Sequence, residues 1–138
     1  MRAKLTALLA LLVVAAVSAL PALGVRSSQT ATSVSVRLKE FKVIPAVPSV
    51  RAGRVTFVVR NVGKLAHEFV VLRTTVAPSK LLVVGAKAKE MGRVGKIPPF
   101  PPGKTRRLTV TPKPGRYVLL CNVPGHYKAG QFIGFRVR

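Results

Sequence analysis

The fold is decided by the stretch Gly115-Arg-Tyr-Val-Leu-Leu-Cys-Asn-Val-Pro-Gly-His-Tyr-Lys-Ala-Gly-Gln-Phe-Ile-Gly-Phe-Arg-Val137. Apolar runs at residues 117–120 and 132–137 predict two strands. The proline and glycines between the runs predict turns, because they suit the backbone angles that turns require. The connecting loop carries Cys121, His126 and Gln131, so three polar side chains can converge on one point.

The rest of the chain also has the pattern of a β-protein. Val34, Val36 and Leu38 alternate with polar residues, which predicts a half-buried strand because side chains in a strand point to opposite faces in turn. About seven short strands with glycine and proline turns, and little helix, predict an all-β fold, an antiparallel Greek-key β-sandwich. The other expected strands cover residues 41–44, 55–59, 68–73 and 108–110.

Residues 77–102 lack a clear period and are expected to be irregular. A short helix is possible at residues 79–84. The prolines at positions 98, 99, 101 and 102 predict a loop within the domain, not a linker between domains.

The N-terminus has the pattern of an export signal. Arg2 and Lys4 precede an apolar run from Leu5 to Val17, and small residues follow it. This pattern predicts a signal peptide at residues 1–24, a flexible spacer at 25–32 and one domain at 33–138. The protein is therefore expected to be exported, in the periplasm, at the cell surface or secreted. The alternative is that the signal stays uncleaved and anchors the protein to the membrane.

The chain is strongly basic. Its 24 lysines and arginines face only three acidic residues, which gives a formal net charge of +21 over 138 residues. The basic residues are scattered singly, and an exported protein does not normally meet nucleic acid, so we expect no nucleic-acid partner. The charge instead favours partner proteins with acidic docking surfaces, or an anionic membrane surface.

One cysteine and two histidines carry the candidate chemistry. A lone thiol outside the cytoplasm needs burial, a partner or a metal to protect it from oxidation. His126 follows Cys121 by five positions, and His67 stands at the start of another expected strand, after the turn at residues 61–63. A thiolate with two imidazoles and one weak axial donor is the ligand set of mononuclear blue-copper sites. These residues therefore predict one copper ion per chain, cycling between Cu⁺ and Cu²⁺.

Simpler interpretations exist for each residue. Cys121 could be a buried structural thiol, and His67 alone would more often be an ordinary histidine. Gln131 could be a polar residue at a strand edge, leaving three ligands. A zinc ion is also possible, although structural zinc usually takes four cysteine or histidine ligands.

These pieces resemble the cupredoxin family, the type 1 copper proteins similar to plastocyanin and azurin, and especially its small bacterial exported members. The matching motifs are Asn61-Val-Gly-Lys-Leu-Ala-His67-Glu-Phe and the stretch from Tyr117 to Val137. The resemblance spans residues 33–138 and implies the ligands His67, Cys121 and His126. The usual axial ligand of the family is methionine, whereas the matching position here is Gln131; Met91 is a poor substitute because it lies in the irregular segment. An amide oxygen should favour Cu²⁺ and lower the reduction potential.

Two further expectations concern the surroundings of the site. Glu68 and Asn122 each follow a ligand, and a hydrogen bond between their side chains would tie the two ligand-bearing loops together. Val123, Pro124 and Gly125 would form an apolar patch near His126, where redox partners dock.

The leading functional hypothesis is a monomeric one-electron carrier. We expect no enzymatic activity, because a copper oxidase or nitrite reductase needs a second metal centre and the two histidines are already used. The chain also contains no aspartate for a Ser/His/Asp arrangement. The alternatives are a protein that stores or delivers copper, and a copper-free cupredoxin-like module that binds partners.

Overall fold

A computed structural model describes residues 31–138. The expected signal peptide, and the spacer up to residue 30, lie outside the described residues. Thr32 already belongs to the first strand, so the regular structure begins one residue before the expected domain boundary. Within the described part of the chain, no helix is long and apolar enough to cross a membrane.

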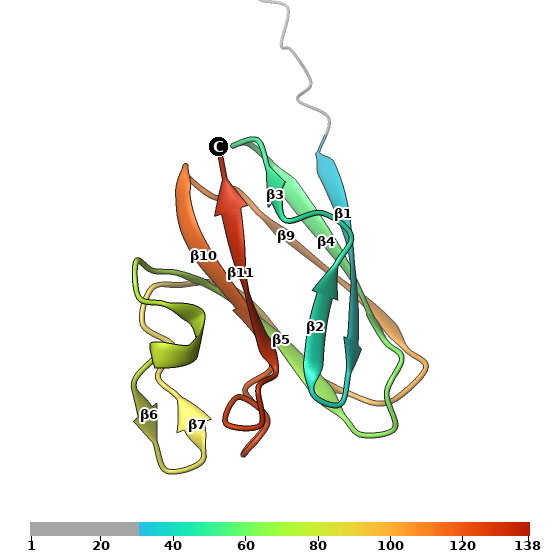
Figure 1. Cartoon of the computed structure of the whole chain (residues 1–138). Helices are drawn as coiled ribbons and strands as arrows, with labels where there is room; N and C mark the ends of the chain where they lie inside the picture. Colours follow the sequence, from blue (N-terminus) through green and yellow to red (C-terminus); the bar gives the residue numbers. More distant parts are fainter. Residues whose placement is uncertain (1–30) are drawn as a thin grey trace, which may run out of the picture.

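Two sheets form the body of the protein (Figure 1). The first has the order β2-β1-β4-β9 and the second the order β3-β11-β10-β5-β8, while β6 and β7 form a separate small hairpin. The strands are β1 (Thr32–Lys39), β2 (Lys42–Pro45), β3 (Ser49–Val50), β4 (Val55–Asn61), β5 (His67–Arg73), β6 (Val83–Val84), β7 (Lys87–Ala88), β8 (Arg93–Phe100), β9 (Thr105–Val110), β10 (Gly115–Leu120) and β11 (Phe132–Val137).

The all-β sandwich is confirmed, but its sheets are mixed. β1 pairs with β4 in parallel, and β3 pairs with β11 in parallel, whereas the other pairings are antiparallel. The sequence pattern predicted only antiparallel pairing. Alternation along a strand fixes which side chains face the core but carries no information about the direction of its neighbour.

The core lies between the two sheets. Alternation in β1 buries Val34, Val36 and Leu38, as predicted. From the same sheet Phe57 packs against Phe69 and Phe135 of the other, with ring centroids 5.3 and 5.7 Å apart. Full burial of one such side chain contributes roughly 1.5–3 kcal/mol. The sandwich therefore has its own source of stability, independent of the end that carries Cys121 and His126.

A second apolar cluster covers the outer face of β5 and β10, which makes these two strands buried on both faces. Residues 78–88 lie over this face, and Tyr127 joins the cluster from the β10–β11 loop. The Tyr127 hydroxyl donates to the Pro78 carbonyl at 2.7 Å and accepts from the Leu81 amide at 3.0 Å. This contact fixes the loop that carries His126.

The expectation for residues 77–102 is wrong in two places. The possible helix is only a short 3-10 turn, Pro78–Lys80, followed by β6. Pro98 and Pro99 lie inside β8 rather than in a loop. β8 is the edge of its sheet, and its register against β5 shifts between His67↔Phe100 and Phe69↔Ile97, which places both prolines at a bulge. Proline is tolerated there because it has no amide hydrogen to donate to a neighbouring strand.

Candidate metal centre

Three donor atoms converge at one end of the sandwich. In Figure 1 this is the end where the β1–β2 turn, the β4–β5 connection and the β10–β11 loop lie, opposite the C-terminus. His67 Nδ1 and His126 Nδ1 are 3.2 Å apart, and Cys121 Sγ lies 3.7 and 3.4 Å from them. All three residues are buried. The sequence prediction that these three side chains meet is borne out by this geometry.

The spacing of these atoms fits a metal ion. The three separations define a circle with a radius of about 2.0 Å, so one point in the plane lies at that distance from every donor. Metal bonds to imidazole nitrogen are roughly 2.0–2.1 Å long and those to thiolate sulfur roughly 2.3 Å. Both imidazoles present the same nitrogen, Nδ1, to that point.

Glu40, which lies in the β1–β2 turn, contacts the ring nitrogen of His67 that does not face the other two donors. His67 Nε2 is 3.1 Å from Glu40 Oε1. Hydrogen bonds from the Leu65 and Lys64 amides lower the pKa of Glu40 to about 2, so its side chain is a carboxylate at neutral pH. Burial lowers the pKa of His67, so its imidazole is neutral. A carboxylate can only accept, so Nε2 carries the hydrogen and the Nδ1 lone pair faces the other two donors.

Cys121 stands at the end of β10 and is fully buried. The Glu68 amide donates to Cys121 Sγ at 3.4 Å, which links the start of β5 to the end of β10. Burial raises the pKa of the thiol to about 11, so without a metal it holds its proton at neutral pH. A cation must displace this proton to bind the thiolate.

Gln131 lies beside the three donors. Its Nε2 donates to the Lys39 carbonyl at 3.1 Å and lies 3.1 Å from His67 Nδ1. Its Oε1 is buried and has no hydrogen-bond partner. An unpartnered buried carbonyl oxygen is costly, and a cation would satisfy it. His67, Cys121 and His126 therefore fit a soft ion as three strong ligands. Gln131 would serve as a weak fourth one once its amide turns to bring Oε1, rather than Nε2, toward His67 Nδ1.

The chain offers no other thiol, and Met91 is the one methionine among residues 31–138. Met91 is 70% exposed in the turn before β8, which agrees with its exclusion as an axial ligand. With only one cysteine and two histidines in the sequence, a zinc site with four such ligands cannot form. The donor chemistry favours copper.

His126 is the most exposed of the three candidate ligands, with 8% of its area exposed. Phe41 covers it, with ring centroids 5.1 Å apart in an edge-on arrangement. Val123 and Gly125 are half-buried and Pro124 is exposed, so this loop does present the expected apolar residues at the surface. Phe41 was not expected to belong to this rim.

The expected hydrogen bond between Glu68 and Asn122 is wrong. Asn122 binds the backbone of Ala88 and donates to Glu90 Oε1, whereas Glu68 pairs with Lys96 at 3.2 Å. Both side chains are buried, but their hydrogen bonds and ion pairs go to different residues and not to each other. Those neighbours come from β7, from β8 and from the residues between them, which lie in the segment that the sequence predicted to be irregular.

The comparisons with known proteins identify the family and the fold of this chain. The family model of the cupredoxin-like domain matches residues 5–133. The chain belongs to this family. A search of the curated proteins found no significant match for this cupredoxin.

Solved structures share the fold of this cupredoxin. Auracyanin from Roseiflexus castenholzii is 20% identical, with a TM-score of 0.61 over 78% of this chain and 98% of that one. Auracyanin A from Chloroflexus aurantiacus, described as a blue copper protein, is 19% identical, with a TM-score of 0.58 over 79% and 100%. Rusticyanin from Thiobacillus ferrooxidans is 21% identical, with a TM-score of 0.58 over 79% of each chain. At these identities the likeness establishes the fold.

Proposed function

We propose that this cupredoxin is a one-electron carrier in which His67, Cys121 and His126 would hold a single copper ion, with Gln131 next to them as a fourth, weaker donor. The observation that supports this most directly is the triangle of buried donors with a centre about 2.0 Å from each. When bound, copper supplies the couple between Cu²⁺ and Cu⁺. The protein carries electrons and is not an enzyme.

The chain's contribution is to keep the donors in place. His67 is held by Glu40, Cys121 by the Glu68 amide, and the His126 loop by Tyr127. Donors fixed in this way cannot rearrange freely when the charge on the metal changes, so little energy is spent on reorganisation. A trigonal set of thiolate and imidazoles suits both oxidation states. This favours transfer of electrons over storage of the ion.

Spectroscopy of the copper-loaded protein tests this proposal. We expect an intense visible band from thiolate-to-Cu²⁺ charge transfer that bleaches with a reductant and returns on oxidation, together with an electron paramagnetic resonance signal from Cu²⁺. Binding of Cu⁺ alone would instead indicate delivery or storage. Failure to bind copper would leave a module that acts only through its surface.

The Gln131→Met variant tests the axial assignment. We expect it to raise the reduction potential, because a thioether is a softer donor than an amide oxygen and stabilises Cu⁺. The measurement is a redox titration of the visible band in both proteins. An unchanged or lower potential would show that residue 131 does not act on the metal. Met91→Leu is the matched control, since Met91 is exposed and should leave the potential unchanged.

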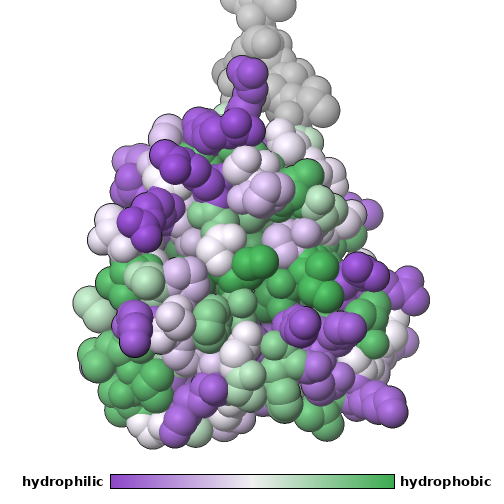
Figure 2. Space-filling view, viewed as in Figure 1, coloured by the Kyte–Doolittle hydropathy of each residue, from purple (hydrophilic) through white to green (hydrophobic). Residues whose placement is uncertain are grey.

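The rim around His126 is the proposed exit for electrons. A groove runs beside it between β2 and the start of β11, and Phe41, Ile44 and Ile133 are among the apolar residues that line it. Figure 2 shows hydrophobic surface gathered in the lower half of the view, where this groove and the β6–β7 hairpin lie. We propose that a redox partner with an apolar contact area and an acidic margin docks here, onto a monomer.

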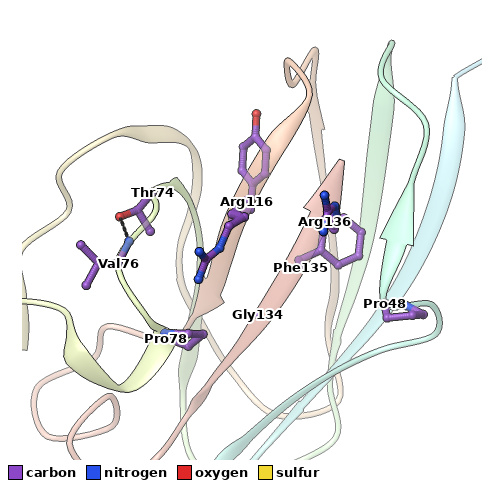
Figure 3. A pocket seen from close by; sticks show the side chains of 9 residues that line it. Pro48, Thr74, Val76, Pro78, Arg116, Gly134, Phe135 and Arg136 are labelled. Carbon is purple, nitrogen blue, oxygen red and sulfur yellow. Dashed lines mark hydrogen bonds between the residues drawn. The ribbon is translucent and has the colours of Figure 1, made fainter. Parts of the chain in front are cut away.

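The opposite end of the sandwich is cationic. The Thr32 amide donates to the Arg54 carbonyl at the start of β1, and the Ala52 amide donates to the Arg138 carbonyl nearby in the chain, so this end carries at least two arginines. On the outer sheet face Arg116 lies directly across from Arg136. Figure 3 shows both beside a pocket bounded by Pro78 on one side and Pro48 on the other. Like charges directly opposite each other repel, so an anion bound between Arg116 and Arg136 would reduce the repulsion between their guanidinium groups.

This end suits an anionic membrane surface. We propose that residues 1–24 direct export, that residues 25–32 form a spacer, and that the cationic end faces lipid headgroups, whether or not the signal is cleaved. Protein lacking residues 1–24 should bind vesicles of phosphatidylglycerol at low salt and release them at high salt, because surface charge is screened. Equal binding to uncharged vesicles would contradict this role.

A further inference from the structure

The negative charge of this protein is concentrated around one site. The chain has only three acidic residues among 138. Glu40 contacts His67, Glu68 donates its amide to Cys121 Sγ, and Glu90 accepts from Asn122, the residue after Cys121. In a protein with a formal charge of +21, every glutamate thus contacts a candidate ligand or the residue next to one.

The three glutamates differ in what compensates their charge. Glu68 pairs with Lys96, and Glu90 pairs with Lys96 and Arg93. Glu40 has no lysine or arginine partner among the described residues, and its one ion-pair contact is to His67. Its charge therefore acts on the imidazole without a competing cation.

Glu40 Oε1 is a shared acceptor. It takes hydrogen bonds from the Lys64 amide at 2.8 Å and the Leu65 amide at 2.7 Å, and lies 3.1 Å from His67 Nε2. One oxygen thus joins the turn before β5 to the ring of the residue that opens β5. The carboxylate is held from the backbone, so its position does not depend on the metal.

We propose that Glu40 is a positioning residue for the metal centre: it fixes the tautomer of His67 and, through its charge, lowers the reduction potential of the bound copper. This inference rests on the proposed function. Its first part concerns the metal-free protein and can be tested separately.

The tautomer follows from the hydrogen-bond partners. A neutral imidazole carries one hydrogen, and an ionised carboxylate at Nε2 requires it there. The lone pair is then on Nδ1, the atom that lies 3.2 Å from His126 Nδ1 and 3.7 Å from Cys121 Sγ. The opposite tautomer would place a hydrogen where the metal must bind. Glu40 therefore prepares His67 as a ligand before any metal arrives.

The effect on the potential follows from charge. Reduction adds one electron, supplied by the redox partner, and converts Cu²⁺ to Cu⁺ at the site. A carboxylate hydrogen-bonded to a ligand makes the imidazole a stronger donor and stabilises the higher positive charge. Removing that charge should therefore favour Cu⁺ and raise the potential.

Gly63 provides a second way to disturb the same contact. A Cβ atom added to Gly63 would lie 2.5 Å from Glu40 Oε1, too close for the carboxylate to stay in place. Gly63→Ala would thus displace the Glu40 side chain while leaving every charge in the protein. It separates the loss of the contact from the loss of the charge.

The first experiment uses nitrogen NMR on the metal-free protein. In the wild type, His67 should show the hydrogen on Nε2. Glu40→Gln should keep this tautomer, because the amide oxygen can accept the same three hydrogen bonds. Glu40→Ala and Gly63→Ala should lose it, giving a mixture of tautomers. If His67 keeps the Nε2–H form in both alanine variants, Glu40 does not fix the tautomer, whatever the protein does with copper.

The second experiment compares the affinities for Cu²⁺ and Cu⁺. Glu40→Gln should weaken Cu²⁺ binding relative to Cu⁺ by about tenfold, which corresponds to an upward shift of about 59 mV in the potential. Glu90→Gln is the matched control: it removes the same charge from a residue that contacts no ligand, and it should give a smaller shift. Equal shifts in the two variants would mean that only net charge matters and would overturn the proposed role. If copper does not bind at all, the proposed function fails, while the NMR result still decides the tautomer.

Discussion

A Cys121→Ser variant should lose the visible charge-transfer band of the copper-loaded protein entirely, while keeping its β-sandwich. The band arises from the thiolate, and the chain has no second cysteine that could replace it. The buried hydroxyl can still accept from the Glu68 amide, which now donates to Cys121 Sγ. The fold should therefore survive the substitution, and absorption spectra with far-ultraviolet circular dichroism measure both outcomes.

The other half of this prediction concerns copper itself. Two imidazoles without the thiolate form a harder site, so any Cu²⁺ that remains should give a pale, weakly absorbing complex. A Cys121→Ser protein that keeps the intense band would contradict the whole assignment of the metal centre. Loss of the dichroism signal would instead show that the Cys121 thiol is needed for packing. The His126→Gln variant would then test the metal site while leaving Cys121 in place.

Most of the strands could be predicted from the sequence because burial follows a period of two. β1, β4 and β11 each alternate between sheltered and exposed positions, and their expected ranges agree with the structure to within a few residues. β8 could not be predicted in this way. Its prolines indicate a loop, and they are accommodated only because the strand lies at a sheet edge and carries a bulge. Edge position is a property of the assembled sheet and not of the segment.

The meeting of the three candidate ligands was easier to predict than their surroundings. Cys121 and His126 are five positions apart on one expected loop, and His67 follows a turn signal. The residue types and their spacing were therefore enough to predict that the three side chains meet. Glu40 lies 27 positions from His67 and is brought to it by the turn between β1 and β2. The one signal that could have drawn attention to it is rarity, because a carboxylate is exceptional in so basic a chain.

The prediction for Glu68 and Asn122 failed for a related reason. Both residues adjoin ligands, and each was expected to find the other across the site. The structure supplies Lys96 to Glu68 and the backbone of Ala88 to Asn122. A buried carboxylate is far more stable beside an ammonium group than beside a neutral amide, so the ion pair is preferred. A position next to a candidate ligand in the sequence therefore does not predict which residue a side chain will pair with in the fold.

Copper should raise the stability of the folded protein substantially. The site joins the start of β5 to the β10–β11 loop, and the unfolded chain cannot hold these donors together. A ligand that binds only the folded state adds about 4 kcal/mol at a free concentration one thousand times its dissociation constant. For a domain of this size the midpoint of thermal unfolding should rise by roughly 15 °C. Calorimetry with and without a chelator measures this rise.

The metal-free protein should nevertheless remain folded. Sixteen buried apolar residues form the main cluster between the sheets, and none of them is a ligand. Cys121→Ser provides the matched control, since its unfolding midpoint should respond little to copper. An equal rise in the variant would mean that copper binds elsewhere on the surface. Unfolding on chelation alone would mean that the metal, rather than the sandwich, holds the fold. The predicted result therefore separates a preformed site, which favours rapid electron transfer, from one that copper must assemble.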